Sequence, residues 1–253
     1  MMKKTLILSL AALAVPELFA IPGTISTDAE TFAGDIKWHA REKKYIVEKG
    51  KITKEFKLAD VTGIDVAKPA GFDKAVQLVQ DGQGASAIGT LTKIVSDYRM
   101  LKWDKPAGRY LAMAHLAAGN AQKAYDACQA IVSEDKSAAY SGDLAAAYWQ
   151  ALLKLGKTEQ LEGLLKKASA AGDRQSSAAA LVMRGDIIVA GSNDKPDELR
   201  RALRDGYLRV VLMYQDAPCA RERAEACLKA AQCFDKLGQS ARAEQLRAQA
   251  KGA

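Results

Sequence analysis

The chain has 253 residues, a net charge of +7, 49% hydrophobic residues and only 6% aromatic residues. This hydrophobic content is ordinary for a folded protein and excludes wholesale disorder. Basic and acidic residues are interspersed along the chain, which argues against a dedicated nucleic-acid surface. The shortage of aromatic residues favours closely packed helices over an aromatic-rich β-sandwich.

Residues 1–20 have the layout of a secretory signal peptide. Two lysines come first, the apolar run 5–15 follows, and the small residue Ala20 marks the expected cleavage position, with Ala14 as the alternative. A run of about eleven residues is too short for a stable membrane anchor, which needs roughly 20. We therefore expect an exported protein without a transmembrane segment in its mature part. It is expected to be periplasmic, associated with the outer membrane, or secreted.

Residues 21–68 are rich in β-branched and aromatic residues in short alternating runs, and they predict a small β module. The expected strands are Gly23–Ser26, Asp35–Trp38, Tyr45–Val47, Ile52–Phe56 and Ile64–Val66. Their spacing resembles that of small SH3-like β modules, so we expect either such a barrel or a curled sheet. Pro69 marks the boundary with the following helices, because proline disfavours helix at the residue before it.

Three aromatic residues are candidates for a contact patch. Trp38 and Tyr45 lie in expected strands and form either an exposed recognition surface or part of the small core. Trp103 lies in the basic stretch 98–110, where it either contacts a partner or packs between neighbouring helical units. The sequence leaves these alternatives open.

From residue 69 the hydrophobic period changes to that of helices, and glycines recur between helical segments. They stand at positions 82, 119, 156, 191 and 238, at intervals of 37, 37, 35 and 47 residues. Small or apolar residues follow at one fixed offset of five in four of the units: Ala87, Ala124, Leu161 and Ala243. Self-similarity at this period predicts about five helical hairpins over residues 69–253, with Pro196 starting the second helix of the fourth. An irregular all-α bundle is the alternative.

These units resemble the tetratricopeptide repeat (TPR) family, whose repeat is about 34 residues long. The resemblance spans residues 69–250, although each copy is degenerate, and it implies an α-solenoid with a concave surface lined by the first helix of each unit. The stretch 202–238 is further similar to exported bacterial members of the family. The residues that the family geometry places on the concave face are Arg109, Met113, Gln150, Lys154, Gln232 and Asp235.

The four cysteines favour packed thiols over a disulfide framework. Cys227 and Cys233 share one expected helix, where six residues separate their Cα atoms by about 9 Å. A disulfide needs Cα atoms within about 7 Å, so these two cannot pair. Cys219 and Cys227 are excluded by the same argument if the helix begins near Pro218.

No residue pattern in the chain predicts catalysis. His39 and His115 fall in different modules, and His115 is expected on the packed side of a helix. Carboxylates such as Asp186, Glu222 and Glu225 are interpreted as charges on solvated helix faces. We therefore expect no enzyme activity, no cofactor and no metal site.

The sequence thus predicts a non-enzymatic scaffold or adaptor of the bacterial cell envelope or secretion apparatus. Its expected partner is a protein or peptide of the envelope, with peripheral contact to anionic envelope components through the positive charge. The alternative is a glycan- or peptidoglycan-binding protein that uses the β module. An envelope enzyme is a third hypothesis.

Overall fold

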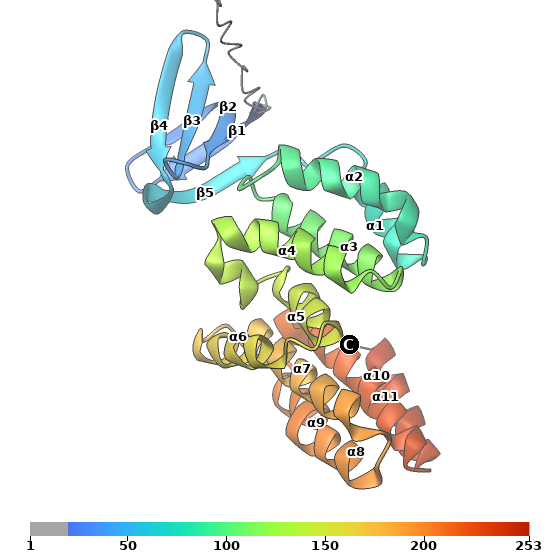
Figure 1. Cartoon of the computed structure of the whole chain (residues 1–253). Helices are drawn as coiled ribbons and strands as arrows, with labels where there is room; N and C mark the ends of the chain where they lie inside the picture. The colour runs from blue at the N-terminus through green and yellow to red at the C-terminus, as the bar shows by residue number, and fades with distance from the viewer. Residues whose placement is uncertain (1–19, 253) are drawn as a thin grey trace, which may run out of the picture. The chain divides into compact units, whose positions relative to one another are not determined.

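The computed structural model describes residues 20–252, which form two compact units that divide between Val66 and Ala67 (Figure 1). The first unit is a β-sheet and the second is built from helices. Apart from Ala20, the expected signal peptide lies outside the described residues. No helix within residues 20–252 combines the length and hydropathy that a membrane span needs.

The first unit is a five-stranded antiparallel sheet with the strand order β4-β3-β2-β1-β5. The strands are β1 (Ile21–Thr27), β2 (Thr31–His39), β3 (Lys44–Lys49), β4 (Ile52–Lys57) and β5 (Val61–Val66), with the 3-10 turn η1 (Leu58–Asp60) before β5. Each strand expected from the sequence lies within one of them. The alternation of apolar and polar residues was sufficient to predict the strands because each strand buries one face.

The buried face of this sheet contains the aromatic pair Trp38 and Tyr45. These residues oppose each other across β2 and β3, and their ring centroids are 4.7 Å apart. Only 2% of Trp38 and 1% of Tyr45 is exposed, and the next pair on the same face, Ile36 and Val47, is fully buried. The exposed recognition surface considered for Trp38 and Tyr45 is therefore wrong, because both rings form the core of the small sheet.

The second unit consists of five helical hairpins in chain order. The hairpins are α1–α2, α3–α4, α5–α6, α7 with α8 and α9, and α10–α11. The helices are α1 (Phe72–Gln80), α2 (Gly84–Asp97), α3 (Asp104–Ala117), α4 (Ala121–Glu134), α5 (Ala145–Lys154), α6 (Thr158–Ala170), α7 (Arg174–Ser192), α8 (Pro196–Ala202), α9 (Leu208–Met213), α10 (Ala220–Lys236) and α11 (Ser240–Lys251). The 3-10 turns η2 (Lys136–Ala139) and η4 (Ala217–Cys219) join hairpins, and the π-helical turn η3 (Leu203–Tyr207) connects α8 to α9.

Four of the hairpins turn in the same way, at a glycine in the left-handed conformation. The glycines are Gly82, Gly119, Gly156 and Gly238, with φ between 67° and 76°. In each turn, the N–H that follows the glycine donates to the carbonyl four residues before the glycine, at 2.8–3.0 Å. This bond satisfies a carbonyl that the end of the helix would leave without a donor. The repeated turn geometry carries the assignment of a hairpin array.

The fourth hairpin turns differently from the sequence prediction. Gly191 lies inside α7, and the left-handed residues are Asn193 and Asp194, with φ of 46° and 57°. Asparagine and aspartate tolerate this conformation because their short side chains bond locally, and the Asp194 N–H is also held by the Ser192 hydroxyl at 3.1 Å. The prediction of a turn at Gly191 is therefore wrong, whereas the prediction that Pro196 begins the next helix, α8, is confirmed.

The hairpins pack through small residues on their second helices and through contacts between successive first helices. Ala87, Ala124, Leu161 and Ala243, which the repeat pattern aligned, are all fully buried. The first helices α1, α3, α5, α7 and α10 contact one another in this order. They therefore form a continuous layer, with the second helices outside it.

All four cysteines are buried and free, as expected from their spacing. Burial raises the pKa of Cys128 to about 12, and burial is also the main reason that the pKa values of Cys219 and Cys233 rise to about 11. The thiolate is the reactive form, and two pKa units correspond to a hundredfold smaller thiolate fraction. We expect alkylation by iodoacetamide at pH 8 to be at least about a hundredfold slower in the native protein than in urea. Mass spectrometry of alkylated peptides measures this, and rapid native labelling of any of these three cysteines would contradict the packing.

Candidate binding pocket on the first-helix layer

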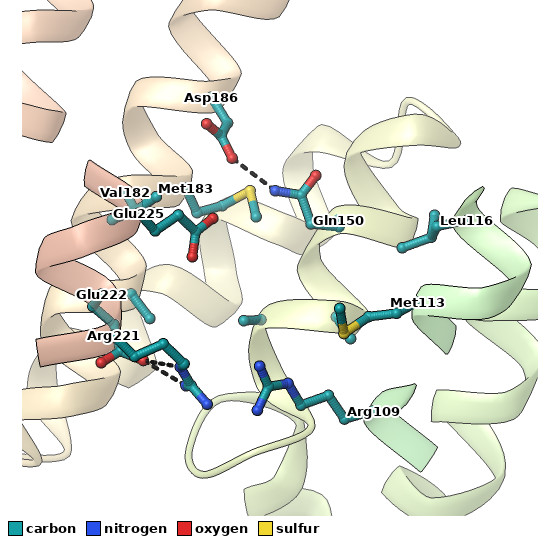
Figure 2. Close-up of a pocket in the computed structure, with 13 residues that line it drawn as sticks. Arg109, Met113, Leu116, Gln150, Val182, Met183, Asp186, Arg221, Glu222 and Glu225 are labelled. Carbon is teal, nitrogen blue, oxygen red and sulfur yellow. Dashed lines mark hydrogen bonds and ion pairs between the residues drawn. The ribbon is translucent and has the colours of Figure 1, made fainter. Parts of the chain in front are cut away.

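The first helices of hairpins two to five, α3, α5, α7 and α10, enclose a pocket of about 150 Å³ (Figure 2). We call it the inner pocket. Its lining residues are Arg109, Met113, Leu116, Ala146, Ala147, Gln150, Ala179, Val182, Met183, Asp186, Arg221, Glu222 and Glu225. It therefore lies on the surface that the repeat resemblance assigns to binding.

The walls of the pocket are largely apolar because each helix presents one stripe of residues spaced by three or four. Met113 and Leu116 come from α3, and Val182 and Met183 come from α7. Between them, α5 contributes alanines such as Ala147, whose small side chains leave the space open. A space of 150 Å³ is large enough for one apolar group the size of benzene.

Asp186 on α7 is the main polar centre of the inner pocket. Its Oδ2 atom accepts hydrogen bonds from Gln150 Nε2 at 2.7 Å and from Lys229 Nζ at 2.6 Å, and its Oδ1 atom accepts one from the Tyr207 hydroxyl at 2.8 Å. The donors come from α5, α10 and η3, so one carboxylate joins three elements to α7. Only 12% of the Asp186 side chain is exposed.

The Asp186 and Glu225 carboxylates keep Lys229 protonated. Burial opposes the charged form of this lysine, but the Asp186 and Glu225 carboxylates outweigh burial and raise the pKa of Lys229 above its usual range. Burial, together with the Asp186 charge, also raises the pKa of the Tyr207 hydroxyl. Both groups therefore act as hydrogen-bond donors at neutral pH.

At the other side of the pocket, Glu222 and Arg221 are consecutive residues of α10. The Glu222 side chain is 2% exposed, and its Oε1 atom accepts from Arg221 Nε at 2.8 Å and from Gln175 Nε2 at 3.3 Å. Arg221 also approaches the Asp143 carboxylate at 3.7 Å, and Arg109 approaches the same Asp143 oxygen at 4.0 Å. Figure 2 shows the two guanidinium groups at this side and the Asp186–Gln150 hydrogen bond at the other.

The interpretation of the acidic residues as charges on solvated faces is wrong for Asp186 and Glu222, since both side chains are largely buried and hydrogen-bonded. It holds for Glu225, which is 46% exposed and pairs with Lys229 at 2.8 Å. The sequence carried a usable signal for Asp186. It follows Val182 and Met183 at helical spacing on an otherwise apolar stripe, where a lone carboxylate needs donors from neighbouring helices.

The structure brings together three of the six residues expected on the concave face. Arg109, Met113 and Gln150 line the inner pocket. Lys154, Gln232 and Asp235 are exposed and do not line it. Lys154 is the last residue of α5, and α10 contributes to the pocket only through its first two turns, so the expected face extended too far along both helices.

Trp103, the third aromatic candidate, is half-buried at the start of α3. Its ring packs edge-to-face on Phe72 at 5.2 Å between centroids, and Tyr110 contacts the same phenylalanine at 6.2 Å. Trp103 therefore joins the first two hairpins, which is the packing alternative that the sequence left open.

Neither histidine that the sequence offered as a general base lines the inner pocket. His39 and His115 lie in different units, and burial together with the charge of Lys123 lowers the pKa of His115. Within residues 20–252, no cluster of three histidine, cysteine, aspartate or glutamate side chains has the geometry of a metal site. The pocket combines an apolar space with paired charges at its sides, which is suited to binding a side chain.

No protein family and no curated protein matches the chain. Among solved structures, it is similar to a kinesin light chain-like protein of Podosopora anserina with nearly identical TPR-like repeats, and to a point variant of that protein. Sequence identity is 17% in both cases, over 71% of this chain and 91% of the other, with TM-scores of 0.41 and 0.42. The description of this chain as a hairpin array rests on its own turns and packing.

Proposed function

We propose that this chain is a non-enzymatic adaptor that binds a protein partner through the inner pocket. The observation that supports the proposal is the pocket itself, which four successive first helices form together and which offers an apolar space between charged sides. Stacked helical hairpins present such a layer as an extended binding surface. An extended peptide segment lying across the layer would insert one apolar side chain beside Met113 and Met183.

The test fills the pocket without removing any of its polar contacts. Ala146 lines the pocket and is half-buried, so Ala146→Phe is expected to occupy the space and to weaken partner capture at least about tenfold. The matched control is Ala170→Phe at the exposed end of α6, which is expected to leave capture unchanged. Affinity capture with the full chain, read by quantitative mass spectrometry, compares the three proteins.

A partner retained equally by Ala146→Phe and by the unsubstituted protein would contradict the pocket as the binding site. Circular dichroism of Ala146→Phe provides the fold control. A turnover that is lost in Ala146→Phe but kept in Ala170→Phe would instead favour an enzyme.

We further propose that the protein works in the bacterial envelope after export. The basis is the signal-peptide layout of residues 1–20, and the measurement is N-terminal sequencing of the protein recovered from fractionated cells. A mature chain that begins at Ile21 in an envelope or extracellular fraction supports export. An intact N-terminus in the cytosolic fraction contradicts it. No observation on the β-sheet favours the glycan-binding alternative, since Trp38 and Tyr45 are buried.

A further inference from the structure

A second hollow lies outside the inner pocket, between the α8–α9 segment and the α10–α11 turn. It has a volume of about 420 Å³, and we call it the arginine-rimmed groove. Its lining includes the apolar residues Leu208, Phe234 and Leu237, which we call its floor. Leu212 on α9 borders it and is 70% exposed. None of these residues belongs to the inner pocket.

The rim of the groove carries four arginines, Arg200, Arg204, Arg209 and Arg242, and no acidic side chain is among the described residues that line it. Arg200 and Arg204 are paired locally with aspartates at 2.8 Å. Arg242 donates only to the neutral amide of Gln239, at 2.8 Å, and its guanidinium lies 5.7 Å from the Phe234 ring centroid. Within the described chain, no carboxylate lies within ion-pair distance of Arg209.

An apolar floor inside a cationic rim selects its occupant by charge and shape. A complementary surface has an apolar stripe flanked by carboxylates, which an amphipathic helix with acidic flanks provides. A flat anionic bilayer would reach the arginines and Leu212, which is 70% exposed, but it would not reach Phe234, which is 8% exposed. The burial of Phe234 among the lining residues therefore favours a protein segment, whose side chains can enter the groove, over a membrane surface.

We propose that the arginine-rimmed groove docks an acidic amphipathic helix of a protein partner. This site is separate from the inner pocket and does not depend on the function proposed for it. One leucine face of the helix covers the floor, and glutamate or aspartate side chains pair with Arg209 and Arg242. The exposed Leu212 is buried by the docked helix.

The test uses the full chain and a fluorescent peptide of about 15 residues with leucines at i, i+3, i+4 and i+7 and glutamates elsewhere. Fluorescence anisotropy is expected to give a dissociation constant on the order of 10 µM, with no binding of the same peptide carrying lysines in place of glutamates. Arg209→Glu and Leu212→Asp are each expected to weaken binding at least about tenfold. Arg209 forms no ion pair among the described residues, and both side chains are exposed, so the variants should fold normally.

Arg184→Glu is the matched control, because Arg184 is exposed on α7 and lines neither the inner pocket nor the groove. This substitution changes the net charge by the same amount as Arg209→Glu. It is expected to alter the affinity less than about twofold. Equal losses in Arg184→Glu and Arg209→Glu, equal binding of the lysine peptide, or no binding of the glutamate peptide would each overturn the proposal. Binding to phosphatidylglycerol vesicles that depends on Arg209, without peptide binding, would also overturn it and assign the groove to lipid.

Discussion

Replacing Asp186 with asparagine is expected to destabilise the protein by about 1.5–3 kcal/mol. The carboxylate accepts from Gln150, Lys229 and Tyr207, at 2.6–2.8 Å, and the Lys229 side chain is only 22% exposed. Asparagine keeps the shape but removes the more buried of the two carboxylates that pair with Lys229, leaving only the 46% exposed Glu225 at 2.8 Å. The loss is costly because three donors on three different elements, one of them charged, lose the carboxylate that they share.

Urea denaturation followed by circular dichroism measures this effect, with Asp205→Asn as the matched control. Asp205 pairs with Arg204 at 2.8 Å but is 38% exposed, so its loss is expected to cost less than about 1 kcal/mol. The double variant Asp186→Asn/Lys229→Met is expected to be more stable than Asp186→Asn alone, since it also removes the cation that has lost its more buried partner. Two independent, additive losses would contradict the assignment of Asp186 and Lys229 as a coupled pair.

The same network has a defined pH dependence. The pKa of Lys229 is raised in the folded protein, so its stabilising contribution is fully present below the unfolded lysine pKa and is lost as pH rises through the folded value. The difference in stability between the unsubstituted protein and Lys229→Met should therefore be constant near neutral pH and should shrink in strongly alkaline solution.

The features that the sequence predicted correctly are those specified by neighbours in the chain. Strand alternation in β1–β5 depends on residues two apart, and the four glycine turns depend on a single left-handed residue beside a helical pattern. The turn predicted at Gly191 was wrong, because a repeat interval does not specify the residue at which a helix ends. Gly191 matched the repeat interval, but α7 continues past it until Asn193 supplies the left-handed conformation.

The inner pocket was predicted only in part because its polar groups depend on contacts between distant segments. Asp186 obtains its donors from residues 36, 43 and 21 positions away, and Glu222 bonds to Gln175, 47 positions away. Hydrophobic spacing places Gln150 and Met113 on an inward face, but it does not identify which carboxylate those faces will enclose. The arginine-rimmed groove was missed for the same reason, since α8–α9 and α11 contribute separate parts of its rim.

Two glycine-to-alanine substitutions are expected to have opposite effects on stability. At Gly206 in η3, an added Cβ would lie 2.8 Å from the Cα and N atoms of Gly185 in α7, and 3.0 Å from the Leu181 carbonyl oxygen. These are backbone atoms, so the neighbour cannot rotate away and the two segments must separate. We expect Gly206→Ala to destabilise the protein by about 3 kcal/mol, at the upper end of the cost of overpacking.

Gly89 provides the comparison because it lies in the interior of α2 and an added Cβ would meet no atom within 4 Å. Alanine is a better helix former than glycine by about 1 kcal/mol, so Gly89→Ala is expected to stabilise the protein by about 0.5–1 kcal/mol. Urea denaturation of both variants measures the difference. Similar effects at the two positions would show that helix propensity, and not the close approach of η3 to α7, governs Gly206.

The position of Gly206 connects this prediction to the inner pocket. The next residue, Tyr207, donates its hydroxyl to Asp186 at 2.8 Å, and its ring would collide with a Cβ on Gly185 at 2.4 Å. Separating η3 from α7 therefore also withdraws a donor from the carboxylate that holds Gln150. Gly206→Ala is expected to weaken partner capture by the inner pocket although Gly206 does not line it, whereas Gly89→Ala should leave capture unchanged.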